Sequence, residues 1–141
     1  MKPLDLTKAP PRSPRRQLDG LDMMPRTIDK LRASLPGGNM GEYKIAGSSQ
    51  RLLDFIGIDA GELRDAIARA EDEAAVARWL AERVPRDLYA KANAALTTRR
   101  LRDVDDLPAL RSRYPIARDL SDDTPLYDLL ELDDKALFPQ R

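Results

Sequence analysis

Three arginines stand close together near the start of the chain, in the segment P-R-S-P-R-R at residues 11–16. A guanidinium group presents a planar fork of N–H donors that matches carboxylates and phosphates. Arg12, Arg15 and Arg16 therefore predict a cationic segment that could wrap a partner or hold an anion. The alternative interpretation, which we favour for this segment, is that these arginines pair with carboxylates of the acidic C-terminal half.

Arg26 and Lys30 lie one helical turn apart, with Asp29 beside them in the sequence. Side chains at positions i, i+3 and i+4 of a helix share one face. The trio predicts either one wall of a polar site or a solvated face with local ion pairs worth about 0.2–0.5 kcal/mol each. The solvated face is the more common outcome for such a trio.

Tyr43, Arg51 and Asp54 supply the other polar groups of a candidate pocket. Tyr43 follows Gly41-Glu42, so its phenol could stand beside a carboxylate at a pocket mouth; alternatively its ring is a core residue with a hydrogen-bonded hydroxyl. Arg51 and Asp54 are three residues apart in an otherwise apolar helix and can pair. Convergence of these three side chains with Arg26 on one concave cavity would favour a small-molecule site.

The chain holds no histidine and no cysteine, which excludes much catalytic chemistry. Disulfides, thiol nucleophiles, zinc sites built from these residues, haem ligation and imidazole proton transfer are ruled out. The glycine-rich turn at residues 37–41 lacks the Gly-Lys-Ser/Thr of a phosphate loop, and the acidic doublets lack calcium-loop spacing. We expect no catalytic motif, no metal and no cofactor, and the sequence leans against an enzyme.

Opposite charges gather in the two halves of the chain. Residues 1–51 hold ten Lys and Arg against five Asp and Glu, and residues 52–141 hold fourteen against nineteen. The net charge of zero therefore hides a cationic first half and an anionic second half, which either attract each other or leave a basic face. Few aromatic residues precede Trp79, so the sequence offers no stacking platform for nucleic-acid bases.

Helical spacing of apolar residues dominates the chain from residue 25 onward. It predicts helices near residues 25–35, 49–56, 60–70, 73–84, 86–100, 106–110 and 125–132. The predicted N-caps are Ser48 or Ser49, Asp59, Asp72, Asp105 or Asp106, and Thr124. The acidic doublet Asp133-Asp134 is also interpreted as a cap, and residues 41–45 as a short strand or an extended loop.

Four prolines within the first 14 residues predict an extended N-terminal arm over residues 1–22. We expect the arm to precede one compact domain at residues 23–141, in an all-α fold of six or seven short helices. No run reaches the roughly 18 apolar residues that cross a bilayer. The N-terminus lacks the apolar stretch of a secretory signal, so we expect a cytoplasmic protein.

Five blocks of the sequence resemble one protein family. They are P-R-S-P-R-R-Q-L (11–18), L-D-M-M-P-R-T-I-D-K-L-R-A (21–33), G-E-Y-K-I (41–45), Q-R-L-L-D-F-I-G-I-D (50–59) and D-D-T-P-L-Y-D-L-L-E-L-D (122–133). Their order and spacing are similar to those of a bacterial domain of unknown function, number five thousand and sixty-nine. The resemblance implies a small cytosolic bacterial protein and no particular activity. Residues 46–50 depart from the family pattern, so a site built there would be altered.

These observations predict a non-enzymatic binding or interaction module with a basic contact surface. The residues of that surface are Arg12, Arg15, Arg16, Arg26 and Lys30. Its expected partner is an acidic protein segment or a small anion. The alternative is an enzyme or a small-molecule binder with a polar pocket, lined by Arg26, Tyr43, Arg51 and Asp54. Nucleic-acid binding through the arm is the weaker third option, and the sequence does not fix the oligomeric state.

Overall fold

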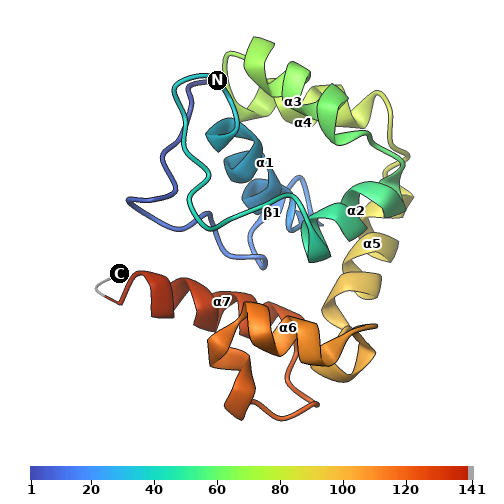
Figure 1. The fold of residues 1–141 in the computed structure, drawn as a ribbon. Helices are drawn as coiled ribbons and strands as arrows, with labels where there is room; N and C mark the ends of the chain where they lie inside the picture. Colours follow the sequence, from blue (N-terminus) through green and yellow to red (C-terminus); the bar gives the residue numbers. More distant parts are fainter. Residues whose placement is uncertain (140–141) are drawn as a thin grey trace.

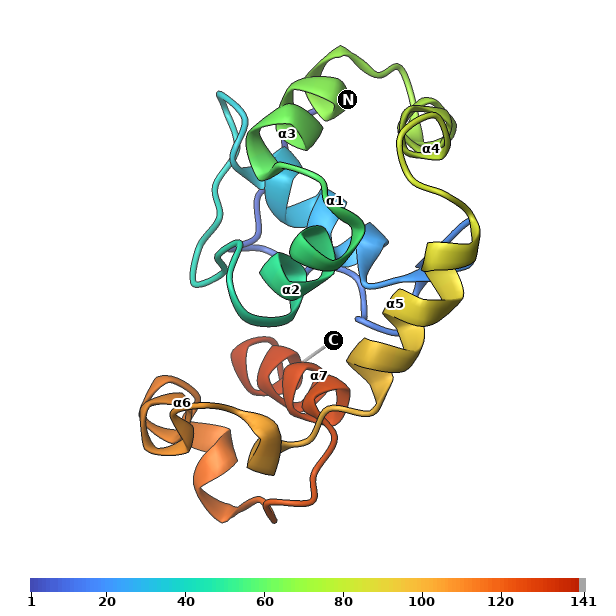
Figure 2. The same ribbon diagram turned by 90° about the vertical axis from the view of Figure 1, so that its right-hand side faces the viewer.

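A computed structural model describes residues 1–139, which form seven α-helices, two 3-10 helices and one two-stranded sheet. In chain order these are β1 (Gln17–Leu18), β2 (Leu21–Asp22), α1 (Met24–Ala33), α2 (Gly47–Ile56), α3 (Ala60–Arg69), α4 (Glu73–Ala81), α5 (Asp87–Thr97), η1 (Leu101–Asp103), α6 (Leu107–Arg113), η2 (Pro115–Asp119) and α7 (Leu126–Leu137). In Figures 1 and 2, α6, η2 and α7 lie below helices α1 to α4. The fold is predominantly helical, as the apolar spacing predicts.

The all-α prediction needs a correction at residues 17–22, where β1 and β2 form a small antiparallel hairpin. Leu18 pairs with Leu21 next to the turn. Asp19 and Gly20 form this turn with φ of 52° and 86°. Positive φ at both central residues is what a two-residue type I′ turn requires, and Asp-Gly adopts it readily. The hairpin therefore lies inside the segment for which the prolines predict an extended arm.

The residues before β1 are tied to the helices by hydrogen bonds. The Met1 ammonium group donates to the carbonyls of Ile67 (2.8 Å) and Ala70 (2.6 Å) at the end of α3. Leu6 is buried, and its amide donates to the Asn39 carbonyl at 2.8 Å. These bonds hold the first residues against the end of α3 and against the loop after α1, and that loop forms part of the site described below.

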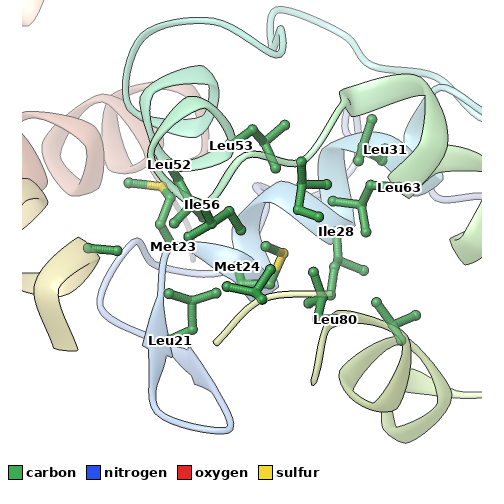
Figure 3. Close-up of a cluster of buried hydrophobic side chains, with 14 of the residues drawn as sticks. Leu21, Met23, Met24, Ile28, Leu31, Leu52, Leu53, Ile56, Leu63 and Leu80 are labelled. Atoms are coloured by element: carbon green, nitrogen blue, oxygen red, sulfur yellow. The ribbon is translucent and has the colours of Figure 1, made fainter. Parts of the chain in front are cut away.

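The main core lies between α1, α2, α3, α4 and α5, with one residue of β2. Figure 3 shows Met24 and Ile28 of α1 directed toward Leu63 of α3 and Leu80 of α4. All four side chains are at most 1% exposed. Two predicted caps are confirmed here, because the Asp59 and Asp72 side chains accept hydrogen bonds from backbone amides in the first turns of α3 and α4.

A smaller core forms among the C-terminal helices. Its buried residues are Leu101, Ala117, Leu126 and Leu129, from η1, η2 and α7. Asp106 caps α6 by accepting from the Ala109 amide, as predicted. Helix α7 joins the two cores, since Leu129 belongs to the smaller one and Tyr127 to the main one. Helix α7 is also linked to α1 by an ion pair between Arg26 and Asp134.

Candidate functional site

A cavity of about 410 Å³ lies where the start of α2 meets α1, α6 and α7, and we call it the central cavity. Its charged lining residues are the cations Arg26, Lys30, Lys44 and Arg113 and the carboxylates Glu42 and Asp133. Two phenol rings and two leucines complete much of the wall, namely Tyr43, Tyr114, Leu130 and Leu137. The volume is in the range of small-molecule sites in proteins. Cations outnumber carboxylates around it.

A buried network of three side chains fixes one wall of the central cavity. Arg26 is 1% exposed, and its Nη1 and Nη2 donate to the two carboxylate oxygens of Asp134 at 2.7 and 3.0 Å. The Tyr43 hydroxyl donates to Asp134 Oδ1 at 2.9 Å. Burial and the Asp134 carboxylate raise the pKa of Tyr43. Asp134 therefore satisfies the Arg26 charge, ties α7 to α1 and keeps the Tyr43 phenol protonated.

A second buried cation, Lys30, lies next to this network. Its side chain is buried, with the residue only 6% exposed, and Nζ donates to Ser49 Oγ at 3.3 Å. Within residues 1–139, this hydroxyl is its hydrogen-bond partner and no acidic group forms an ion pair with it. Burial and the Arg26 charge, with Arg113 adding to them, lower the pKa of Lys30 to about 7 against the opposing effect of Asp134.

The amino end of α2 forms another wall of the central cavity. The prediction of Ser48 or Ser49 as N-cap is wrong, because α2 begins at Gly47 after Ala46, which makes no side-chain cap. Gly47 has a φ of 55°, and among residues 1–139 no atom beyond its own helix and chain neighbours lies within 4 Å of where its Cβ would stand. The first amides of a helix lack intrahelical acceptors and carry the positive end of the helix dipole. The uncapped start of α2 thus adds to the positive potential of the cavity.

The structure brings together only part of the predicted pocket. Arg26 and Tyr43 line the central cavity, and Arg26 Cζ lies 5.6 Å from the centre of the Tyr43 ring. Arg51 lines a neighbouring cavity of about 370 Å³ together with Arg99. Asp54 lines neither cavity and accepts from the Gln50 side chain at 2.8 Å instead of pairing with Arg51. The four predicted side chains therefore do not converge on one site.

Two of the three arginines at residues 11–16 form ion pairs. Arg12 pairs with Asp29 at 3.0 Å and with Glu73 at 2.5 Å. Arg15 pairs with Asp128 at 2.5 Å and with Glu131. Arg16 is exposed. Arg26 and Lys30 are buried, so the five residues of the predicted basic surface do not form one exposed face.

Sequence reasoning missed several residues of the site, Asp134 above all. The Asp133-Asp134 doublet resembles a helix cap, but α7 continues to Leu137 and places it inside the helix. One signal was present, because Asp134 lies seven residues after Tyr127 and therefore on the same face of α7. The sequence indicates only a capping role for Ser49, and Arg113 and Tyr114 belong to no motif.

Comparison with protein-family models identifies a family for most of the chain. A family model described as Domain of unknown function (DUF5069) matches residues 8–136. Of the central cavity's lining residues, all but Leu137 fall inside this range. A search of curated proteins finds no match to the chain. Among residues 1–139, no helix has the length and apolar character needed to span a membrane.

Proposed function

This chain belongs to the DUF5069 family, whose description states no activity, and we propose from its own residues that it binds a small anionic molecule in the central cavity. One observation carries the proposal. Lys30 is a buried lysine on the cavity wall whose Nζ contacts a hydroxyl and no carboxylate of residues 1–139.

Burying an ammonium group away from water is costly unless an opposite charge accompanies it. Arg26 meets this requirement through Asp134. Because Asp134 is already bound by Arg26, Lys30 has no carboxylate partner among residues 1–139. Arg26 and Arg113 also oppose the positive charge on Lys30. A carboxylate or phosphate on a bound molecule would supply the missing negative charge. The amides at the start of α2 would donate hydrogen bonds to the same anion.

The size and lining of the central cavity narrow the ligand class. About 410 Å³ admits a compact metabolite rather than a peptide or a nucleic-acid strand. Leu130, Leu137 and the ring of Tyr114 offer a small apolar surface beside the cations. The ligand therefore carries one anionic group and a short body. The basic docking surface is less favoured, because Arg12 and Arg15 already pair with carboxylates.

Replacing Lys30 by methionine tests the proposal. We expect lactate and inorganic phosphate to bind the wild-type chain saturably and to shift the amide resonances of residues 47–49 in ¹H–¹⁵N spectra. Lys30→Met removes a charge-assisted hydrogen bond worth about 1.5–3 kcal/mol, so affinity should fall at least about tenfold. Nuclear magnetic resonance titration gives both the dissociation constant and the location of the shifts.

Lys91→Met is the matched control. Lys91 lies on α5 with its side chain 67% exposed and pairs only weakly with Asp87 at 3.8 Å. This variant should keep the wild-type dissociation constants for both anions. Equal binding by Lys30→Met and wild type, or shifts that centre on exposed Arg16 and leave residues 47–49 unmoved, would contradict the proposed site.

A further inference from the structure

We propose that Lys30 is also an amine nucleophile, which forms an imine with the carbonyl group of a small oxo acid. The inference rests on the proposed function, because the oxo acid's carboxylate would occupy the same anion site. It goes beyond that function by assigning covalent chemistry and by naming the substrate class. Three features of the structure support it: the hydroxyl network at Lys30, the charges that face it and the composition of the cavity wall.

Two hydroxyl groups orient the Lys30 amine. The Thr27 hydroxyl donates to the Met23 carbonyl at 2.9 Å, and the hydroxyl oxygens of Thr27 and Ser49 lie 3.2 Å apart. Threonine has a single hydroxyl proton, so the contact between the hydroxyls uses the Ser49 proton. Ser49 Oγ can then only accept from Lys30 Nζ. The lone pair of a neutral Lys30 amine is therefore not bound by Ser49, and it is available to attack an electrophile.

The charges around Lys30 favour the neutral amine that this attack requires. Arg26 on α1 and Arg113 on α6 both oppose its protonation, whereas Asp134 on α7 is already bound by Arg26 and Tyr43. Arginine stays charged at all relevant pH values, so Lys30 is the cation of this group that gives up its proton. With a pKa of about 7, a large fraction of Lys30 is a free amine near neutral pH.

An α-oxo carboxylate matches the groups that the cavity presents. Its carboxylate suits Arg113 and the start of α2. Its carbonyl carbon is bonded to that carboxylate and would therefore lie near Lys30, whose amine contacts Ser49 in the first turn of α2. The remaining charged lining groups are Glu42, Lys44 and Asp133. Burial and the neighbouring Asp134 raise the pKa of Asp133, which makes it the carboxyl group best suited to supply a proton.

The proposed step needs no oxidant or reductant. The Lys30 nitrogen forms a bond to the carbonyl carbon, and one amine proton moves to the carbonyl oxygen to give a carbinolamine. The carbon–oxygen bond then breaks. The oxygen leaves as water with a second proton, which Asp133 provides. The nitrogen keeps its other proton and the product is an iminium ion, with a positive charge next to the ligand's carboxylate.

Reductive trapping tests the inference. The full chain is incubated with pyruvate and sodium cyanoborohydride, which reduces the iminium to a stable secondary amine. The five other lysines of the sequence and the N-terminal amine are the competitors. We expect intact-mass analysis to show one adduct and peptide mapping to place it on Lys30. At pyruvate concentrations well below saturation, the trapping rate should rise with pH around about 7, the value to which the pKa of Lys30 is lowered in the free protein.

Controls separate this inference from the proposed function. Lys30→Met should lose the adduct, Lys91→Met should keep it, and lactate, which has no carbonyl, should block trapping by competition. Saturable lactate and phosphate binding without any Lys30 adduct would overturn the imine and leave the proposed function standing. Label spread evenly over the exposed lysines, or a rate that rises only near the ordinary lysine pKa, would also overturn it.

Discussion

Asp134→Asn is expected to lower the free energy of unfolding by about 3–5 kcal/mol, because it leaves Arg26 as a buried charge without a counterion. The Arg26 residue is 1% exposed and the pair is closed by two hydrogen bonds of 2.7 and 3.0 Å. Asparagine has nearly the same shape as aspartate, and its side-chain oxygen can still accept from the Tyr43 hydroxyl. The loss of stability therefore reports the removal of the negative charge. Urea unfolding followed by circular dichroism gives the free energy and its slope with denaturant.

Two further variants make this result specific. Asp128→Asn on the same helix breaks a pair with Arg15 whose side chains are 47% and 45% exposed, so we expect a change within about 1 kcal/mol. The double substitution Arg26→Met with Asp134→Leu removes both charges and should recover much of the loss. A fall for Asp134→Asn no larger than that for Asp128→Asn would show that α7 is not held to α1 through this buried pair.

Lys30→Met is expected to raise stability at acidic and neutral pH by an amount on the order of a few kcal/mol, and the gain should shrink as pH rises. Folding lowers the pKa of Lys30 from 10.5 to about 7. Below about 7 the folded wild type buries a charge that methionine does not carry. Between about 7 and 10.5 the unfolded chain binds a proton that the folded chain has lost, so the wild type gains stability with increasing pH.

The informative quantity is the difference between the two proteins, measured by urea unfolding from about pH 6 to about pH 9.5. The raised pKa values of Tyr43 and Tyr127 affect both proteins and largely cancel in the difference. Lys91→Met, which removes an exposed ammonium, should show a flat difference from the wild type. If the difference in unfolding free energy between Lys30→Met and the wild type were also independent of pH, Lys30 would be solvated. That result would contradict the buried lysine on which the proposed anion site depends.

The helices could be predicted from the sequence because their signals are local. Apolar periodicity needs only neighbouring residues, and the Asp59, Asp72 and Asp106 caps act within one turn of their helices. The hairpin was also signalled locally, by Asp19-Gly20, but the surrounding prolines favoured an extended arm over residues 1–22. The choice between a hairpin and an extended arm depends on what the segment packs against, which the local sequence does not show.

The site was predictable in its residue types and not in its pairings. Arg26, Lys30 and Tyr43 stood out as polar groups near apolar runs, and the structure places all three on the central cavity. The partner of Arg26 lies 108 residues away in the sequence, and no local pattern selects it. A solvated face was the natural expectation for Lys30, yet nine of the ten α1 residues are buried because the hairpin, α2, α3 and α7 surround that helix.

The protonation of the Lys30 amine, observed directly, tests the central claim. Heteronuclear magnetic resonance of lysine labelled at Cε and Nζ follows each of the six amines through a pH titration. We predict that Lys30 titrates near its lowered pKa of about 7 in the free protein, and that its midpoint moves upward when lactate or phosphate occupies the cavity. A Lys30 midpoint near the ordinary 10.5, unmoved by either anion, would contradict the account.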